Sequence, residues 1–127
     1  MVSYRTPLSR VKGLGSAQAG TEHYWAQRVT GLANLGLLVF LIYSGIRLAG
    51  EPLEFVRAYF ASPAVAILAS LFAVSATYHM RIGMQVIIED YIHRESSKLA
   101  LMILNTFFAV AVALTCVMAI IKLSLGA

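Results

Sequence analysis

A histidine follows a long uncharged segment of this chain. His79 comes directly after residues 63–78, which contain no charged side chain. Ionisable residues at membrane depth are usually functional, and a neutral imidazole in hydrocarbon must find a partner. Its options are a hydrogen bond to another helix, a proton-relay role, or an axial bond to haem iron. The residues alone leave these three options open.

Polar and small residues recur on the helix face that carries His79. At about 100° per residue, the eleven steps from His79 to Asp90 come within about 20° of whole turns, so both lie on one face, ~16 Å apart along the axis. Gly83 and Val86 lie between them. This face therefore carries an imidazole at mid-bilayer depth, a gap at Gly83, and a carboxylate at the water interface with the Tyr91 phenol beside it.

Three apolar segments are long enough to hold these residues in a membrane. About 20 apolar helical residues cross a ~30 Å hydrocarbon core. We predict spans at about 29–48, 62–88 and 99–121. Pro63 suits the first turn of the second span, and residues 53–59 suit a short interfacial turn before it. The predicted fold class is an all-α integral membrane protein with three transmembrane helices.

The N-terminal lead differs from the rest of the chain. Residues 1–21 are polar and interrupted by Pro7 and three glycines, so we predict a cytoplasmic arm followed by a three-helix domain at residues 22–127. The first 25 residues contain no apolar region typical of a secretory signal. Leaving out Arg81, six Lys and Arg lie on the N-terminal side of the spans and three on the other. The positive-inside rule then predicts a cytoplasmic N-terminus and a periplasmic C-terminus.

The composition excludes several classes of protein. Of the 127 residues, 59% are hydrophobic and 13% are charged, more apolar surface than a soluble core of this size can bury. The net charge of +4 comes from segment ends and the N-terminal lead, so no nucleic-acid partner is expected. The single Cys116 forms no intrachain disulfide. No nucleophile with its base and no phosphate or dinucleotide motif occurs, so no catalytic residue is predicted.

The spacing of His79, Gly83 and Asp90-Tyr91, followed by His93, resembles the small hydrophobic membrane-anchor subunit of succinate dehydrogenase (succinate:quinone oxidoreductase, respiratory complex II). The three-span layout and the polar lead resemble this family over most of the chain. The resemblance implies a subunit without catalytic activity of its own, forming half of a heterodimeric helical membrane anchor. It also implies docking of a flavoprotein subunit and an iron–sulfur subunit, which hold the FAD and the iron–sulfur clusters.

The resemblance also assigns roles to residues. It implies that His79 is one axial ligand of a haem b iron and that a cytochrome b partner subunit supplies the other. It implies that Tyr91 donates a hydrogen bond to a quinone carbonyl, with Asp90 beside it, and ubiquinone is the expected quinone. Arg28 is a candidate contact for a haem propionate or the quinone pocket, or an arginine that sets orientation. The expected location is the bacterial inner membrane.

Some of these residues have simpler explanations. Asp90 and Tyr91 also describe an ordinary helix end with an interfacial aromatic side chain. Since His23 and His93 lie at interfaces, one copy of the chain has a single imidazole at depth. A bis-histidine haem site therefore requires a partner chain.

The alternative function from a different class is a small transporter or channel accessory subunit without haem. His79 and Arg81 would then line a polar path, although Arg81 lies ~200° round the helix from His79. The resemblance assigns Arg81 no role. A reduced-haem absorption spectrum separates the two functions, because a transporter subunit gives no b-type signal.

Overall fold

The computed structural model describes residues 6–13 and 20–126. The regular secondary structure of this part of the chain is all helical: α1 (Pro7–Val11), α2 (Gly20–Leu48), α3 (Leu53–Phe60), α4 (Pro63–Tyr91) and α5 (Glu95–Ser124). Helices α2, α4 and α5 are long and apolar enough to cross a membrane. The prediction of an all-α chain with three membrane-spanning helices is confirmed.

The boundaries of the helices follow from local sequence. After α2, Gly50 adopts a positive φ of 81°, a conformation that costs glycine little. Pro52 directly precedes α3 and has an extended conformation. Pro63 occupies the start of α4 after Ser62. A backbone N–H at this position has no intrahelical acceptor, so the proline removes no hydrogen bond. The predicted interfacial turn at residues 53–59 is therefore part of a short helix, α3.

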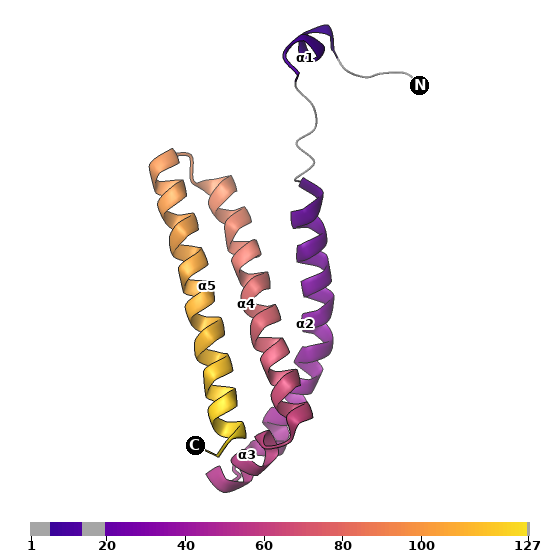
Figure 1. The fold of residues 1–127 in the computed structure, drawn as a ribbon, viewed down its shortest axis with the longest axis vertical. Coiled ribbons are helices and arrows are strands. Elements are labelled where there is room, and N and C mark those ends of the chain that lie inside the picture. Colours follow the sequence, from indigo (N-terminus) through magenta and orange to yellow (C-terminus); the bar gives the residue numbers. More distant parts are fainter. Residues whose placement is uncertain (1–5, 14–19, 127) are drawn as a thin grey trace, which may run out of the picture.

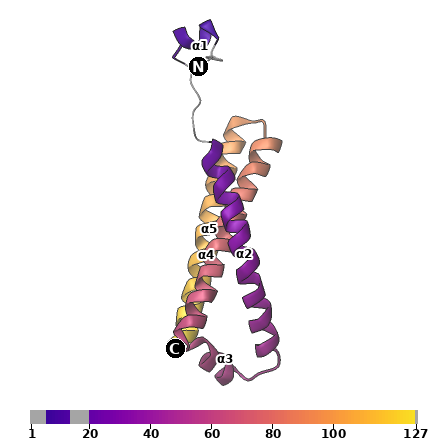
Figure 2. The same cartoon turned by 90° about the vertical axis from the view of Figure 1, so that its right-hand side faces the viewer.

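The long helices are arranged around α4 (Figures 1 and 2). Helix α5 runs antiparallel to α4 and lies beside it, while α2 packs on α4 and crosses it at an angle. The lower ends of α2 and α4 diverge in Figure 2, and α3 lies across that end. Helix α3 is tied to α2 there, because Ser44 Oγ lies 2.9 Å from Tyr59 Oη and Ser44 is only 5% exposed. Helix α2 begins at the opposite end of the bundle from the end of α5.

Most large apolar side chains of the long helices face outward. Leu32, Ile46 and Phe107 are among those that are largely exposed. Among the described apolar residues, only Ile82, Ile88 and Ala109 are buried. Such a surface suits lipid rather than water, and the chain is a multi-pass membrane protein.

The helices extend beyond the predicted spans. Helix α2 begins at Gly20, inside the predicted arm, and α4 continues to Tyr91. The short helix α1 at Pro7–Val11 was not predicted from the sequence. Residues 1–5 and 14–19 of the predicted arm lie outside the described residues, so the division at residues 21 and 22 stays a prediction.

Candidate functional site

His79 lies on the face of α4 that packs against α2. It is half-buried, and its Nδ1 lies 3.0 Å from Oγ1 of Thr30 on α2. The same Thr30 oxygen lies 2.6 Å from the carbonyl oxygen of Ala26, one turn earlier in α2. The Thr30 hydroxyl therefore links the imidazole to the backbone of the neighbouring helix.

Glycines allow α2 and α4 to approach each other at this point. A Cβ added at Gly31 would lie 3.5 Å from His79 Cε1, so a side chain longer than a methyl group would meet the ring. A Cβ added at Gly83 would lie 3.6 Å from Nε2 of Gln27 on α2. Gly83 and His79 thus share the α2-facing side of α4, as the predicted spacing requires, and Gln27 lies against the gap at Gly83.

An open groove lies beside His79 between α2 and α4. Its volume is about 400 Å³, and its walls are mainly apolar, with Leu35, Leu38 and Phe72 among the lining residues. Asn34 also lines the groove, and its buried Oδ1 has no hydrogen-bond partner among the described residues. Because buried polar atoms normally have a partner, this groove is a place where a group from outside the chain is expected.

Arg28 lies on a second groove between the same two helices. This groove of about 290 Å³ is formed by residues from the first turns of α2 and by Ile82 and Val86 of α4. Arg28 is exposed, and its guanidinium carbon lies 4.4 Å from the centre of the Tyr24 ring, a cation–π contact. Gln27 also lines this groove, and its buried Oε1 has no partner in the described part of the chain.

Tyr91 and Asp90 lie at the C-terminal end of α4, and both are exposed. Tyr91 is 76% exposed and lines a groove of about 440 Å³ between α4 and α5, together with Ile88 and Leu104. This groove is on the α5 side of α4, whereas His79 faces α2. The structure therefore does not bring Tyr91 into the groove beside His79, and within the described residues Asp90 forms no hydrogen bond.

Arg81 faces α5 rather than α2. Its Nε donates a hydrogen bond to Thr106 Oγ1 at 3.2 Å, and Asn105 Nδ2 donates one to the Arg81 carbonyl oxygen at 2.9 Å. These bonds join α4 to α5. Because Arg81 and His79 face different helices, the two do not line one polar path.

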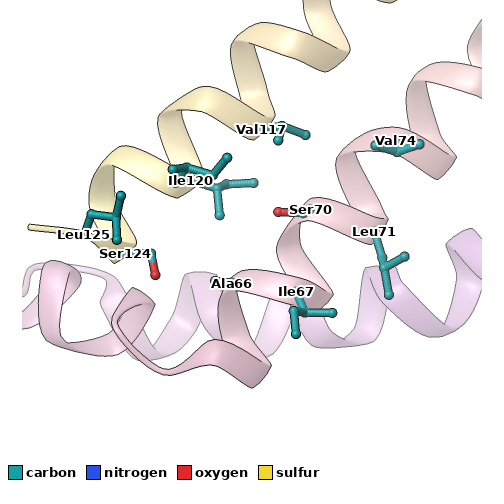
Figure 3. A pocket seen from close by; sticks show the side chains of 10 residues that line it. Ala66, Ile67, Ser70, Leu71, Val74, Val117, Ile120, Ser124 and Leu125 are labelled. Atoms are coloured by element: carbon teal, nitrogen blue, oxygen red, sulfur yellow. The ribbon is translucent and has the colours of Figure 1, made fainter. Parts of the chain in front are cut away.

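The remaining large groove lies at the far end of the bundle (Figure 3). It has a volume of about 530 Å³ between the start of α4 and the end of α5. Ser70 points from α4 toward Ile120 of α5 in this view, and no titratable residue is among the described lining residues. In residues 6–13 and 20–126, no three His, Cys, Asp or Glu side chains gather as metal ligands.

The polar residues of α2 were missed in the sequence, although their spacing carried a signal. Gln27, Thr30, Gly31 and Asn34 follow the i, i+3, i+4, i+7 pattern of one helix face. This pattern indicates a polar and small face for close packing. It does not indicate which helix that face meets, so the pairing with His79 required the structure.

Helices α2, α4 and α5 are long and apolar. His79 of α4 lies against α2, and Tyr91 lies at the end of α4. These features define a multi-pass membrane protein with a polar site between its helices. Residues 2–113 match the succinate dehydrogenase/fumarate reductase transmembrane subunit family. The chain therefore belongs to this family.

Individual relatives agree with the family. The chain is 34% identical to the succinate dehydrogenase hydrophobic membrane anchor subunit of Paracoccus denitrificans over 124 residues, 98% of this chain and 95% of the relative. It is 28% identical to the same subunit of Rickettsia conorii over 118 residues, 92% and 94% of the two chains. No solved structure matches significantly. The resemblance drawn from the His79 to Tyr91 spacing is confirmed, as is the prediction of a subunit of the succinate dehydrogenase complex.

Proposed function

We propose that this chain anchors succinate dehydrogenase in a bacterial inner membrane and that His79 is one of two axial ligands of a shared haem b. The observation that carries the proposal is the state of the His79 ring. Its Nδ1 is held by Thr30, whereas its Nε2 has no hydrogen bond within the described residues. Histidines that ligate metals almost always donate their other ring N–H to a neighbouring acceptor.

The surroundings of His79 fit one half of a haem site. The groove beside the ring is open and mainly apolar, and it contains the unpartnered Oδ1 of Asn34. Gly31 leaves one edge of the ring uncrowded. A single imidazole from this chain leaves the second axial position to a cytochrome b partner subunit. When bound, the haem supplies one-electron redox chemistry inside the membrane.

Tyr91 and Asp90 are proposed to border the site of quinone reduction, with ubiquinone as the substrate. The exposed Tyr91 hydroxyl offers a donor at the end of α4, where quinone oxygens can take protons from water. The groove beside Tyr91 has apolar walls, which suit an isoprenoid tail. Asp90 is proposed to orient the phenol or nearby cations through its charge.

The charged end of the bundle is the proposed docking side for the extramembrane subunits. The turn between α4 and α5 carries Arg94, and Lys98 Nζ lies 3.4 Å from the Glu89 carbonyl oxygen. The flavoprotein and iron–sulfur subunits, with their FAD and iron–sulfur clusters, would meet the chain here. Arg28 lies on a groove of the α2/α4 face and stays the candidate for a haem propionate or quinone-pocket contact.

The test is the reduced-haem spectrum of the purified complex after His79→Leu. We expect loss or strong perturbation of the b-type signal with some complex still assembled, because helix packing is retained. His93→Leu is the matched control, since His93 is exposed in the α4–α5 turn. A normal low-spin spectrum in the His79 variant would show that another residue binds the iron. Absence of any b-type signal from the unaltered complex would show that this anchor holds no haem b.

The orientation of the chain has a separate test. The Lys and Arg asymmetry predicts a cytoplasmic tag at Met1 and a periplasmic tag at Ala127. Protease added to right-side-out vesicles should remove only the C-terminal tag. Removal of both tags from one side would contradict three spans.

A further inference from the structure

We propose that Thr30 is a positioning residue for His79, setting both the tautomer and the direction of its ring. The inference rests on the proposed role of His79 as an iron ligand and adds a specific function for α2. It comes from three atoms: Thr30 Oγ1, His79 Nδ1 and the Ala26 carbonyl oxygen.

The Thr30 hydroxyl has only one hydrogen, and the backbone of α2 takes it. The distance from Thr30 Oγ1 to the Ala26 oxygen is 2.6 Å, within the range of an O–H···O bond. Two oxygens this close need a hydrogen between them, because a carbonyl oxygen has none to give. The Thr30 hydroxyl therefore donates to Ala26 and can only accept from His79.

The proton on the imidazole follows from this arrangement. With Thr30 Oγ1 as the acceptor at 3.0 Å, His79 Nδ1 must carry the hydrogen. In a neutral ring this leaves Nε2 with its lone pair free, the state that an iron ligand needs. Because Nδ1 is fixed toward α2, the ring cannot rotate freely about its side-chain bonds. Thr30 therefore fixes the tautomer and the direction of the His79 ring before iron binds.

Thr77 provides a matched comparison inside the same structure. Thr77 Oγ1 donates to the carbonyl oxygens of Ala73 and Val74, at 2.7 and 3.0 Å. Thr30 makes the same pair of backbone contacts, to Ala26 at 2.6 Å and Gln27 at 3.3 Å. Of these two threonines, Thr30 has an additional partner on another helix, whereas within the described residues Thr77 bonds only its own helix. The effect of losing a threonine hydroxyl can therefore be separated from the effect of losing the bond to His79.

The experiment compares Thr30→Val, Thr30→Ser and Thr77→Val in the purified complex. The readouts are haem content, the midpoint potential of the haem, and the electron paramagnetic resonance signal of its ferric form. Valine keeps the volume of threonine and removes the hydroxyl, whereas serine keeps the hydroxyl. Loss of the Nδ1 bond makes the imidazole a weaker donor to ferric iron.

We expect Thr30→Val to retain haem but to raise its potential, by up to about 59 mV, the one-electron equivalent of a tenfold change in relative binding of the two iron states. Its ferric signal should also shift or broaden as the ring orientation spreads. Thr30→Ser should restore both values, and Thr77→Val should match the unaltered complex.

Two results separate this inference from the proposed function. If His79→Leu abolishes the b-type signal while Thr30→Val leaves potential and ferric signal unchanged, the role of Thr30 is wrong and the ligand assignment stands. If His79→Leu keeps the b-type signal, both the ligand assignment of His79 and the role of Thr30 are wrong. An equal shift in Thr30→Val and Thr77→Val would contradict a specific bond to His79.

Discussion

The two faces of α4 use polar side chains in different ways. Toward α5, Arg81 and its neighbours are joined within the chain, since Arg81 bonds Thr106 and Asn105 bonds the Arg81 backbone. Toward α2, the pairing is incomplete, because buried oxygens of Gln27 and Asn34 have no partner among the described residues.

The polar residues between α4 and α5 join the two helices, whereas Gln27 and Asn34 of α2 each have a buried oxygen without a partner in the described part of the chain. Intramembrane polar contacts such as those to α5 contribute modest stability, on average about 0.6 kcal/mol. Unpaired buried groups instead cost free energy unless something else binds them. The α2 face, with His79 in it, is therefore the face on which we expect a partner group, while the α5 face closes the bundle.

The largest expected effect that distinguishes the two faces comes from Gly31→Leu. A leucine side chain there would extend into the His79 ring, since even a Cβ lies 3.5 Å from Cε1. Overpacking of this kind costs about 1–3 kcal/mol. We expect roughly tenfold less haem-containing complex, because ~1.4 kcal/mol corresponds to a factor of ten. The measurement is haem per assembled complex.

Gly36→Leu is the control for this substitution, because a Cβ at Gly36 meets no atom within 4 Å. It should assemble with normal haem content. Equal loss in both variants would mean that leucine on α2 disturbs membrane insertion rather than the contact with His79.

An effect of similar or smaller size is expected for Tyr91→Phe, on the α5 side. Removing one hydroxyl takes away a hydrogen bond of about 0.5–1.5 kcal/mol, and somewhat more as charge develops on the quinone oxygen. We expect quinone turnover to fall about tenfold, since ~1.4 kcal/mol is one factor of ten in rate. Asp90→Asn should impair the same step. Electron transfer from succinate to an artificial acceptor upstream of the quinone should be unaffected.

Tyr43→Phe serves as the control for the phenol, since Tyr43 is an exposed tyrosine of α2. Its quinone kinetics should be normal. Parallel loss of activity with the artificial acceptor in Tyr91→Phe would indicate defective assembly, and unchanged quinone kinetics in both Tyr91→Phe and Asp90→Asn would make this end of α4 an ordinary helix terminus.

The smallest expected effect is that of Thr106→Val, which removes the acceptor of the Arg81 Nε hydrogen bond. We expect a loss of about 0.6–1.7 kcal/mol in the stability of the helix pair, measured by thermal unfolding of the complex in detergent. Haem potential should not change. Thr115→Val on the same helix is the control, because Thr115 bonds only its own helix among the described residues. A shifted haem potential in Thr106→Val would contradict the separation of the two faces.

Features governed by neighbouring residues were predictable from the sequence. Pro63 marks the start of α4, and the apolar runs give the three long helices. The rotation of about 100° per residue places His79 and Arg81 on different faces, as the structure does. These features depend on steric and hydrophobic rules that act within one helix.

Features that depend on pairing between helices were not predictable in the same way. The bond between Thr30 and His79 joins residues 49 positions apart and depends on how α2 crosses α4. Tyr91 was predicted beside Asp90 at the end of the His79 face, yet it lines the groove toward α5. Successive residues differ by about 100° around the helix axis. Tyr91 can therefore face α5 although Asp90, directly before it, was predicted on the His79 face.

The length of the helices has a consequence for where Tyr91 lies relative to the lipid. Helix α4 has 29 residues, so it is ~43 Å long. To lie wholly within a ~30 Å hydrocarbon layer, α4 would need a tilt of about 46° from the bilayer normal. This tilt exceeds the roughly 0–40° seen for transmembrane helices. At least one end of α4 therefore stands in the headgroup layer. The apolar run begins at Pro63 and the charged residues gather near Glu89. We therefore expect the Tyr91 end of α4 to be the part that emerges, with the phenol among lipid headgroups rather than acyl chains.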